Sequence, residues 1–240
     1  MLAWNWFFAW LVVYIFINGF VLEIYMHRGL AHNYFVSSAL FGHICRFALW
    51  LRGSNNYRWM ELYQYNHLRH HRLSDSIEDT QSPFHLTFRN MFQRQAIDYA
   101  EFDKFSPINR TPTDWVQTHV YNAYPQKGPW ITHALNFCMF GIVGFVLSII
   151  VVTFINRYFF IYIGNYIVHK VGFTYAGNHG SDRSKIMFPI GIILFGEELH
   201  ANHHNDPSTI NYAQRWFEYD FGYTLIKVLD KLKLITITKK

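Results

Sequence analysis

The sequence predicts an all-α integral membrane protein of about three transmembrane helices and one interfacial helix, with a helical cytoplasmic cap. Three observations support this fold class. Of 240 residues, 51% are hydrophobic and 20% aromatic, a more apolar composition than soluble domains usually have. Long apolar segments alternate with polar ones. Histidine clusters at residues 27–32, 67–71 and 200–204 each follow an apolar segment.

The first apolar segment, residues 2–22, contains no charged residue before Glu23 and is long enough for one crossing of a bilayer. A secretory signal would begin with Lys or Arg and end at a small-residue cleavage site, and this segment has neither. We therefore expect a retained transmembrane helix that leads directly into the first histidine cluster.

The second apolar segment, residues 35–51, is interrupted by His43 and Arg46 and is barely long enough to cross a bilayer. A full crossing would place the first and second histidine clusters on opposite sides of the membrane. A metal site shared by the clusters therefore requires this helix to lie at the interface or to enter the bilayer only partly.

Residues 130–154 and 158–173 form two further apolar segments with only Asn156 and Arg157 between them, which predicts a transmembrane hairpin. With three crossings, 20 of the 21 Lys and Arg residues fall on the histidine side, and Arg157 alone falls on the other. By the positive-inside rule, the histidine side is cytoplasmic.

The rest of the chain completes one domain, residues 1–240. A polar region at 72–128, rich in proline, is the expected cytoplasmic cap, and residues 186–195 are too short to span a bilayer.

Cys45 and Cys138 lie in apolar segments without a Cys-x-x-Cys pair, so no disulfide scaffold or thiolate metal site is indicated. The net charge of +5 includes no basic run with interleaved aromatics, so we expect no nucleic-acid partner.

The histidine clusters predict a metal site. Neutral imidazole is a good ligand for transition metals, and histidines at i, i+3 and i+4 project from one face of a helix. One such triplet is compatible with a surface accident or a nucleic-acid contact. Two triplets and a pair, all at the ends of apolar segments, favour metal binding. The candidate ligands are His27, His32, His67, His70, His71, His200, His203 and His204.

Eight imidazoles are more than one ion can use, so we expect two ions. Structural zinc takes four ligands, and catalytic zinc takes about three and a water. Carboxylate-bridged di-iron bundles need two Glu-x-x-His motifs, and only Glu197 with His200 has that spacing. An all-histidine pair of irons is the remaining option. Iron rather than zinc follows only if the site carries out redox chemistry.

These motifs resemble those of the membrane fatty acid desaturases, particularly the acyl-CoA and acyl-lipid enzymes that look like stearoyl-CoA desaturase and its bacterial relatives. The likeness covers roughly residues 20–235 and rests on His-x4-His, His-x2-His-His and His-x2-His-His in that order. Flanking residues add to it: Ser74-Asp75, Asp79, Ser82-Pro83, Gly196-Glu197, Asp206-Pro207, Arg215-Trp216-Phe217-Glu218 and Asp220.

The resemblance implies a ninth ligand from an Asn-x3-His element, which Asn165 and His169 match. His169 would bind metal, and Asn165 would hold a metal-bound water. An ionisable residue in a membrane helix is a functional candidate in its own right, and i, i+4 spacing places the two on one face. The alternative is an interfacial histidine beside Lys170. Five histidines are expected to be surface or hydrogen-bonded residues instead: His43, His85, His119, His133 and His179.

The activity that the resemblance implies is oxygen-dependent desaturation of a fatty acyl chain. Two iron ions, O2 as co-substrate and electrons from outside would introduce a cis double bond, of delta-9 type. No catalytic residue is expected beyond the metal site. Four carboxylates are candidates to orient the imidazole N–H groups: Asp75, Asp79, Glu197 and Glu198.

The expected partners are membrane lipids, a fatty acyl substrate and a separate electron donor such as ferredoxin or a small haem protein. An Arg-Asp pair that precedes the second cluster in animal acyl-CoA enzymes is replaced by Tyr65-Asn66, which favours an acyl chain on a phospholipid or carrier protein over acyl-CoA. No dinucleotide-binding or haem-attachment motif is present. The basic face suits an acidic redox partner or anionic lipid. We expect a bacterial inner membrane, with the metal site cytoplasmic.

Two other functions stay open at this point. A related di-iron membrane hydroxylase, acetylenase or ketolase acting on a lipid would have similar histidine patterns. A non-enzymatic metal carrier or sensor would bind one labile ion and consume no oxygen.

Overall fold

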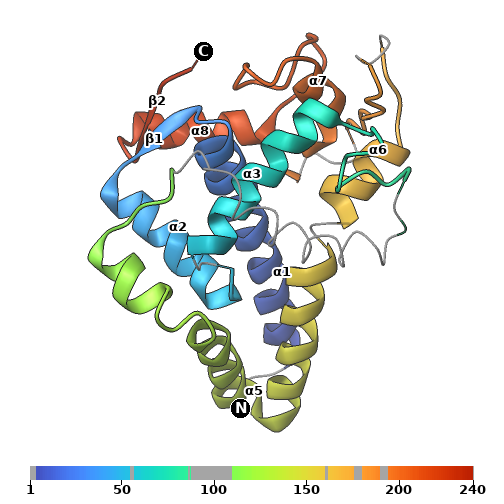
Figure 1. The fold of residues 1–240 in the computed structure, drawn as a ribbon. Helices are drawn as coiled ribbons and strands as arrows, with labels where there is room; N and C mark the ends of the chain where they lie inside the picture. The colour runs from blue at the N-terminus through green and yellow to red at the C-terminus, as the bar shows by residue number, and fades with distance from the viewer. Residues whose placement is uncertain are drawn as a thin grey trace.

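The computed structural model describes residues 4–54, 57–85, 87, 110–159, 162–175, 180–189 and 194–239. Figure 1 shows a broad cap of short helices and loops at one end, and a narrow end at which the N-terminus and helix α5 lie. The described residues are mostly helical and include one small sheet, so the predicted helical class is correct at this level.

Helix α1 (Trp4–Phe20) continues without interruption into the π-helix η1 (Val21–Ala31). Most α1 side chains are exposed although they are apolar, whereas η1 is almost wholly buried in the cap. Trp4–Ala31 is one of two helices in the described part of the chain that are long and apolar enough to cross a membrane, and Lys127–Phe154 is the other. The first predicted transmembrane helix is therefore a candidate membrane-spanning helix, and its C-terminal part, η1, is buried at the broad end of the molecule.

Helix α5 (Lys127–Phe154) contains a reversal of the chain at Gly141, and Figure 1 draws it as two neighbouring legs. The backbone of Gly141 has φ 72° and ψ −162°, a region that is essentially restricted to glycine. Side chains from the two legs meet, since His133 Nδ1 lies 3.0 Å from Ser148 Oγ and the rings of Phe137 and Phe145 are 6.3 Å apart.

The predicted hairpin therefore turns at Gly141, and its predicted turn at Asn156 and Arg157 is wrong. The chain continues there as the π-helix η3 (Ile155–Phe159). Two polar residues in an apolar sequence suggested a turn, but a helix can carry them, whereas only a glycine permits the backbone geometry of the real reversal. The reversal retains the charge asymmetry, because no Lys or Arg lies between Lys127 and Arg157.

Helix α2 (Ala39–Arg52) begins at Ser38, whose side chain accepts a hydrogen bond from the Phe41 N–H, and ends at Gly53 with φ 84°. One face packs against η1 through buried side chains that include Cys45 and Leu49. The opposite face exposes Leu40, Ile44 and Phe47. A helix this short with one exposed apolar face favours the interfacial placement over a full crossing.

Several further elements complete the described part of the chain. They are α3 (Tyr57–Leu73), η2 (Gln117–Tyr121), η4 (Tyr162–Ile167), α6 (Val168–Lys170), η6 (Glu197–Leu199), α7 (His200–Asn205) and α8 (Phe221–Lys231). Strands β1 (Phe35–Ser37) and β2 (Ile235–Ile237) pair antiparallel, with Phe35 opposite Ile237, and hold the C-terminus beside the first histidine cluster. Parts of the predicted polar cap and of residues 186–195 lie outside the described residues, as does His179.

Candidate metal centre

The structure brings all nine predicted histidines together, in two groups. They come from the end of η1, from α3, from α6 and from α7. In each group, the candidate ligand atoms all lie within 4.8 Å of one another. The five-histidine group is His27, His32, His67, His71 and His203, and the four-histidine group is His70, His169, His200 and His204.

In the five-histidine group, imidazole nitrogens face one another at short distances. His27 Nε2 lies 3.1 Å from His203 Nε2, and His32 Nε2 lies 2.7 Å from His67 Nε2. Because His27 Nδ1 donates to Glu23 Oε2 at 2.8 Å, the Nε2 of His27 presents a lone pair to the group. Converging imidazole lone pairs are the arrangement that a shared cation stabilises.

In the four-histidine group, each Nδ1 faces a carboxylate. His70 Nδ1 donates to Asp79 and His169 Nδ1 donates to Asp75, both at 2.8 Å. His200 Nδ1 lies 3.0 Å from Glu197, and His204 Nδ1 lies 3.1 Å from Asp182. A carboxylate at Nδ1 fixes the tautomer and leaves Nε2 as an acceptor toward the centre of the group.

Two of these inward nitrogens lack hydrogen-bond partners within the described part of the chain. They are the Nε2 atoms of His70 and His204, and both are buried. Burying a polar atom without a partner is costly, so such atoms indicate a missing ligand. The donor set is all imidazole. Carboxylates contact every histidine of the four-histidine group and His27 of the five-histidine group, and this set fits transition-metal ions such as iron.

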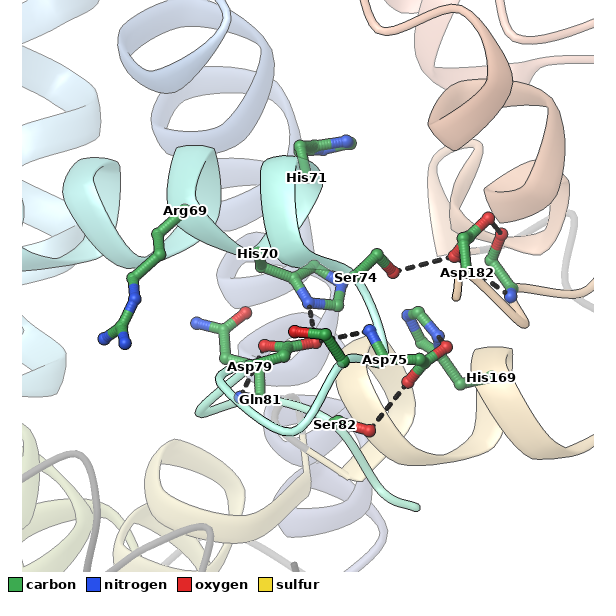
Figure 2. Close-up of polar contacts among 12 residues, drawn as sticks. Arg69, His70, His71, Ser74, Asp75, Asp79, Gln81, Ser82, His169 and Asp182 are labelled. Atoms are coloured by element: carbon green, nitrogen blue, oxygen red, sulfur yellow. Dashed lines mark hydrogen bonds and ion pairs between the residues drawn. The ribbon is translucent and has the colours of Figure 1, made fainter. Parts of the chain in front are cut away.

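The loop after α3 supports the four-histidine group through Asp75 and Asp79 (Figure 2). Asp75 Oδ2 accepts from His169 Nδ1 and from the Arg183 N–H, and its Oδ1 accepts from Ser82 Oγ. Asp79 Oδ2 also accepts from the Asp75 N–H at 2.9 Å. Burial raises the pKa of Asp75. The hydrogen bonds that its carboxylate accepts from His169, Ser82 and the Arg183 N–H outweigh burial, so the pKa of Asp75 lies below its usual value.

Glu197 contacts one imidazole of each group. Its carboxylate oxygens lie 3.0 Å from His27 Nδ1 and 3.0 Å from His200 Nδ1. Although burial opposes ionisation, the neighbouring imidazoles hold the pKa of Glu197 well below its usual value. A single carboxylate therefore couples the two groups.

Glu198 does not have the position that the sequence suggested. Its carboxylate accepts from the Gly196 N–H at 3.1 Å, and it contacts no imidazole among the described residues. Burial raises the pKa of Glu198 to about 8. Successive residues of the 3₁₀ turn η6 point in different directions, so Glu197 and Glu198 cannot both face the histidines.

Two further carboxylates contact the histidines and were not among the predicted residues. Asp182 accepts from Ser74 Oγ at 2.7 Å (Figure 2) and from Ser184 Oγ at 2.7 Å, in addition to its contact with His204. No sequence spacing links Asp182 to the third cluster. Glu23 lies four residues before His27 on one helix, and this i, i+4 spacing was a usable signal.

A buried ion pair fixes the first histidine cluster relative to the third. Arg28 donates to both carboxylate oxygens of Asp220 at 2.9 Å, and to the carbonyls of Ile210 and Phe195 at 2.9 Å. Its guanidinium lies 3.8 Å from the ring centre of Tyr212, which stacks on His203 at 4.2 Å. A Cβ at Gly196, where φ is +105°, would meet the Arg28 side chain, so glycine is required there.

A cavity of about 510 Å³ adjoins the histidines. Asn165, which is partly buried, lines it together with His70 and His200, and so faces the same space as the four-histidine group. The apolar part of the wall includes Leu22, Trp59, Leu62 and Tyr63. Its volume is within the range of small-molecule sites.

The other described histidines lie outside both groups, as expected. His43 lies 3.3 Å from Arg46, and His85 Nε2 donates to the Asp75 carbonyl at 2.9 Å. His119 donates to the Trp115 carbonyl of its own helix, and His133 pairs with Ser148.

Comparisons with known proteins identify two relatives, and no family model matches the chain. The sn-1 stearoyl-lipid 9-desaturase of Synechocystis sp. is 25% identical over 239 residues, which cover 95% of this chain and 72% of the relative. A probable chloroplastic lipid desaturase of Arabidopsis thaliana is 26% identical, over 98% of this chain and 63% of that protein. The chain therefore spans less than two thirds of the second relative. These matches relate it to the lipid desaturases, which are oxidoreductases.

Proposed function

We propose that this chain, a relative of the lipid desaturases, is a membrane fatty acyl desaturase that introduces a cis double bond, of delta-9 type, into an acyl chain. One observation supports this most directly. Two groups of imidazoles converge beside a cavity with a partly apolar wall, and carboxylates contact all of the four-histidine group and His27 of the other group.

The metal ligands are proposed to divide between the two groups. The five-histidine group would hold one iron, and the four-histidine group would hold the other, with Asn165 joining the second through a water. When bound, the two irons supply the redox chemistry by which O2, with two external electrons and two protons, removes two hydrogens from adjacent methylenes and becomes two waters. This balance yields one double bond for each O2.

The chain's own residues would prepare this site. Asp75, Asp79 and Asp182 keep a proton on Nδ1 of their histidines, so that each Nε2 remains available as a ligand. The Glu197 carboxylate lies 3.0 Å from Nδ1 of one histidine of each group and would stabilise both electrostatically. The carboxylates also add negative charge around a ligand set that has none, which offsets the charge of two metal ions.

The proposed substrate is an acyl chain on a membrane lipid, rather than on coenzyme A or a carrier protein. The Synechocystis relative is named for a stearoyl-lipid substrate. Tyr65-Asn66 also replaces the Arg-Asp pair of the acyl-CoA enzymes. The cavity wall offers Leu22, Leu62 and Trp59 to methylene groups.

The proposed setting is a bacterial inner membrane, with the histidines on the cytoplasmic side and electrons from ferredoxin or a small haem protein. The exposed apolar faces of α1 and α5 at the narrow end support insertion in a bilayer. The absence of Lys and Arg from residues 128–156 supports an external location for the turn at Gly141.

Lipid profiling tests this function. Cells that express the wild type should contain new cis-unsaturated acyl chains by gas chromatography with mass spectrometry, and cells that express His203→Ala should not. His119→Ala is the matched control, because His119 is exposed and, among the described residues, bonds to the carbonyl of Trp115 in its own helix. An unchanged double-bond content in wild-type cells would overturn the proposal. A hydroxylated product without unsaturation would assign the site to the related lipid hydroxylases, and labile binding of one ion without oxygen consumption would indicate a metal carrier.

A further inference from the structure

Two segments of the cap form a patch of exposed aromatic side chains. Trp216 is 95% exposed, and Phe173, Tyr175 and Phe217 are also exposed. Tyr175 joins the segments, because its ring lies 6.1 Å from that of Phe217 and the Arg215 guanidinium lies 3.5 Å from its centre. We call Phe173, Tyr175, Trp216 and Phe217 the aromatic patch. A cluster of exposed aromatic rings on a folded surface is typical of an interaction site.

The turn that displays Trp216 is held rigidly from below. The Glu218 carboxylate, only 8% exposed, accepts from the N–H groups of Gln214 at 2.7 Å and Arg215 at 3.0 Å. It also accepts from Asn202 Nδ2 at 2.9 Å. The turn is therefore fixed with Trp216 pointing outward, and this large ring is not left exposed by a loose loop.

The bilayer does not explain the patch. The segment after α6 and the loop after α7 lie at the broad end of the molecule, opposite the N-terminus and α5 (Figure 1). Helix α5 and the exposed part of α1 occupy the narrow end. A partner that approaches the broad end must come from the aqueous phase.

The charges around the patch suit an acidic partner. Arg215, which contacts Tyr175 of the patch, is partly exposed. Lys170 and Arg183 are exposed on the neighbouring segments of the chain, where each lies 4.5 Å from the Phe84 ring. Three of the four acidic side chains described in these segments are engaged in the protein. Asp182 contacts His204, Glu218 caps the turn and Asp220 pairs with Arg28, whereas Asp206 is exposed and accepts from Ser208 and Thr209. The described outer surface is therefore aromatic, with three cationic side chains and one exposed carboxylate.

We propose that the aromatic patch is the docking surface for a small acidic one-electron carrier protein. This inference rests on the proposed function, since desaturation needs two electrons and the chain has no motif for a redox cofactor other than its histidines. At each docking event, the carrier is oxidised by one electron and the histidine-bound metal is reduced by one. Two docking events therefore supply the two electrons that the formation of one double bond requires.

The connection from the patch to the metal site is short. Trp216 is two residues from Glu218, whose carboxylate receives the hydrogen bond from Asn202. Asn202 is the direct neighbour of His203 in α7. One hydrogen bond therefore links the docking turn to the five-histidine group. Glu218 and Asn202 act as positioning residues, and neither is expected to contact the acyl substrate.

The test uses the iron-loaded full chain in lipid vesicles, with an acidic [2Fe–2S] ferredoxin and the soluble domain of an acidic b-type cytochrome as probes. We expect Trp216→Ala to weaken binding of at least one carrier about tenfold or more. The carrier concentration that gives half-maximal desaturation should rise by the same factor. The desaturation rate with a small chemical reductant in place of the carrier should stay unchanged. Arg183→Glu should also weaken binding and reduce its salt dependence.

Trp115→Ala is the matched control, because Trp115 is 67% exposed and does not belong to the patch. Equal carrier binding by the wild type, Trp216→Ala and Trp115→Ala would overturn the docking proposal. Brominated lipid that quenches tryptophan fluorescence in the wild type but less in Trp216→Ala would overturn it too, by placing the patch in the bilayer. If the wild type makes no unsaturated product with any reductant, the proposed function fails, and the binding comparison still decides the docking surface.

Discussion

His27 Nε2 lies 3.1 Å from His203 Nε2, although 176 positions separate the two residues in the chain. The contact joins the end of a long membrane-type helix to a six-residue helix of the cap. Neither element could hold this geometry alone, so the site depends on the packing that brings η1 and α7 together.

The division into two histidine groups predicts the iron content. The double variant His67→Ala/His203→Ala removes two imidazoles from the five-histidine group and none from the other. We expect bound iron to fall from about two ions to about one per chain, because metal sites need their full ligand set. Elemental analysis by mass spectrometry measures this, with His119→Ala as the control. Two retained irons in the double variant would contradict the grouping.

Asp182 is expected to matter more for metal binding than Glu198 does. Asp182→Asn replaces the carboxylate that faces His204 Nδ1 by an amide, and loss of such a partner typically costs about 10- to 100-fold in metal affinity. Glu198→Gln is the matched control, since Glu198 accepts from a backbone N–H and touches no imidazole in the described structure. Competition with a chelator measures iron affinity in both. Equal affinities would show that Asp182 does not orient His204.

The metal-free protein should lose stability on acidification. Burial and neighbouring imidazoles hold the pKa values of His67, His71 and His203 well below the ordinary 6.5. The unfolded chain therefore binds more protons than the folded one, so stability is complete above about pH 6.5 and is lost as the pH falls below it. Asp79 raises the pKa of His70 in spite of burial, which gives the opposite sign. Burial also lowers the pKa values of His32, His169 and His204, so the lowered groups predominate.

Thermal melting in detergent tests this pH dependence. We expect the Tm of the metal-free protein to fall between about pH 8 and about pH 5.5, and we expect bound iron to move the fall to lower pH, because metal ions compete with protons for imidazole. A Tm that stays flat over this range without metal would show that the imidazoles are not held neutral by the fold.

The Arg28–Asp220 pair is expected to stabilise the packing of η1 on the third cluster. Asp220→Asn would leave the fully buried Arg28 guanidinium without a counter-charge, which typically costs about 3–5 kcal/mol of unfolding free energy. The comparison variant is Asp114→Asn, because Asp114 pairs with the buried Arg46 but is itself 44% exposed, so water can replace part of the lost carboxylate and the loss of stability should be smaller. Chemical denaturation measures both, and comparable losses would contradict the assigned role of burial.

The sequence was sufficient to select the nine histidines that the structure brings together and to predict the helical class of the fold. Histidine spacing on α3 and α7 depends only on helix geometry, and the apolar length of α1 depends only on bilayer thickness. Both properties are local, so the spacing of His67, His70 and His71 was enough to assign them to one helix face. The number of crossings and the extent of the cap remain predictions.

The errors arose where the structure depends on tertiary contacts. Asp182 reaches His204 because Ser74 and Ser184 hold its carboxylate, and no spacing in the chain reports such a contact. Glu198 looked equivalent to Glu197, but the turn at η6 points it elsewhere. The hairpin reversal was predicted at polar residues, whereas backbone conformation placed it at Gly141.

The reversal at Gly141 has a consequence for the surrounding lipid. The leg before it, Lys127–Phe140, is about 21 Å long at 1.5 Å per residue, whereas the hydrocarbon core of a typical bilayer is about 30 Å thick. Bilayers accommodate such hydrophobic mismatch by local thinning. The protein should therefore fit thin, disordered bilayers better than thick, ordered ones, and double bonds in acyl chains shift a membrane in that direction.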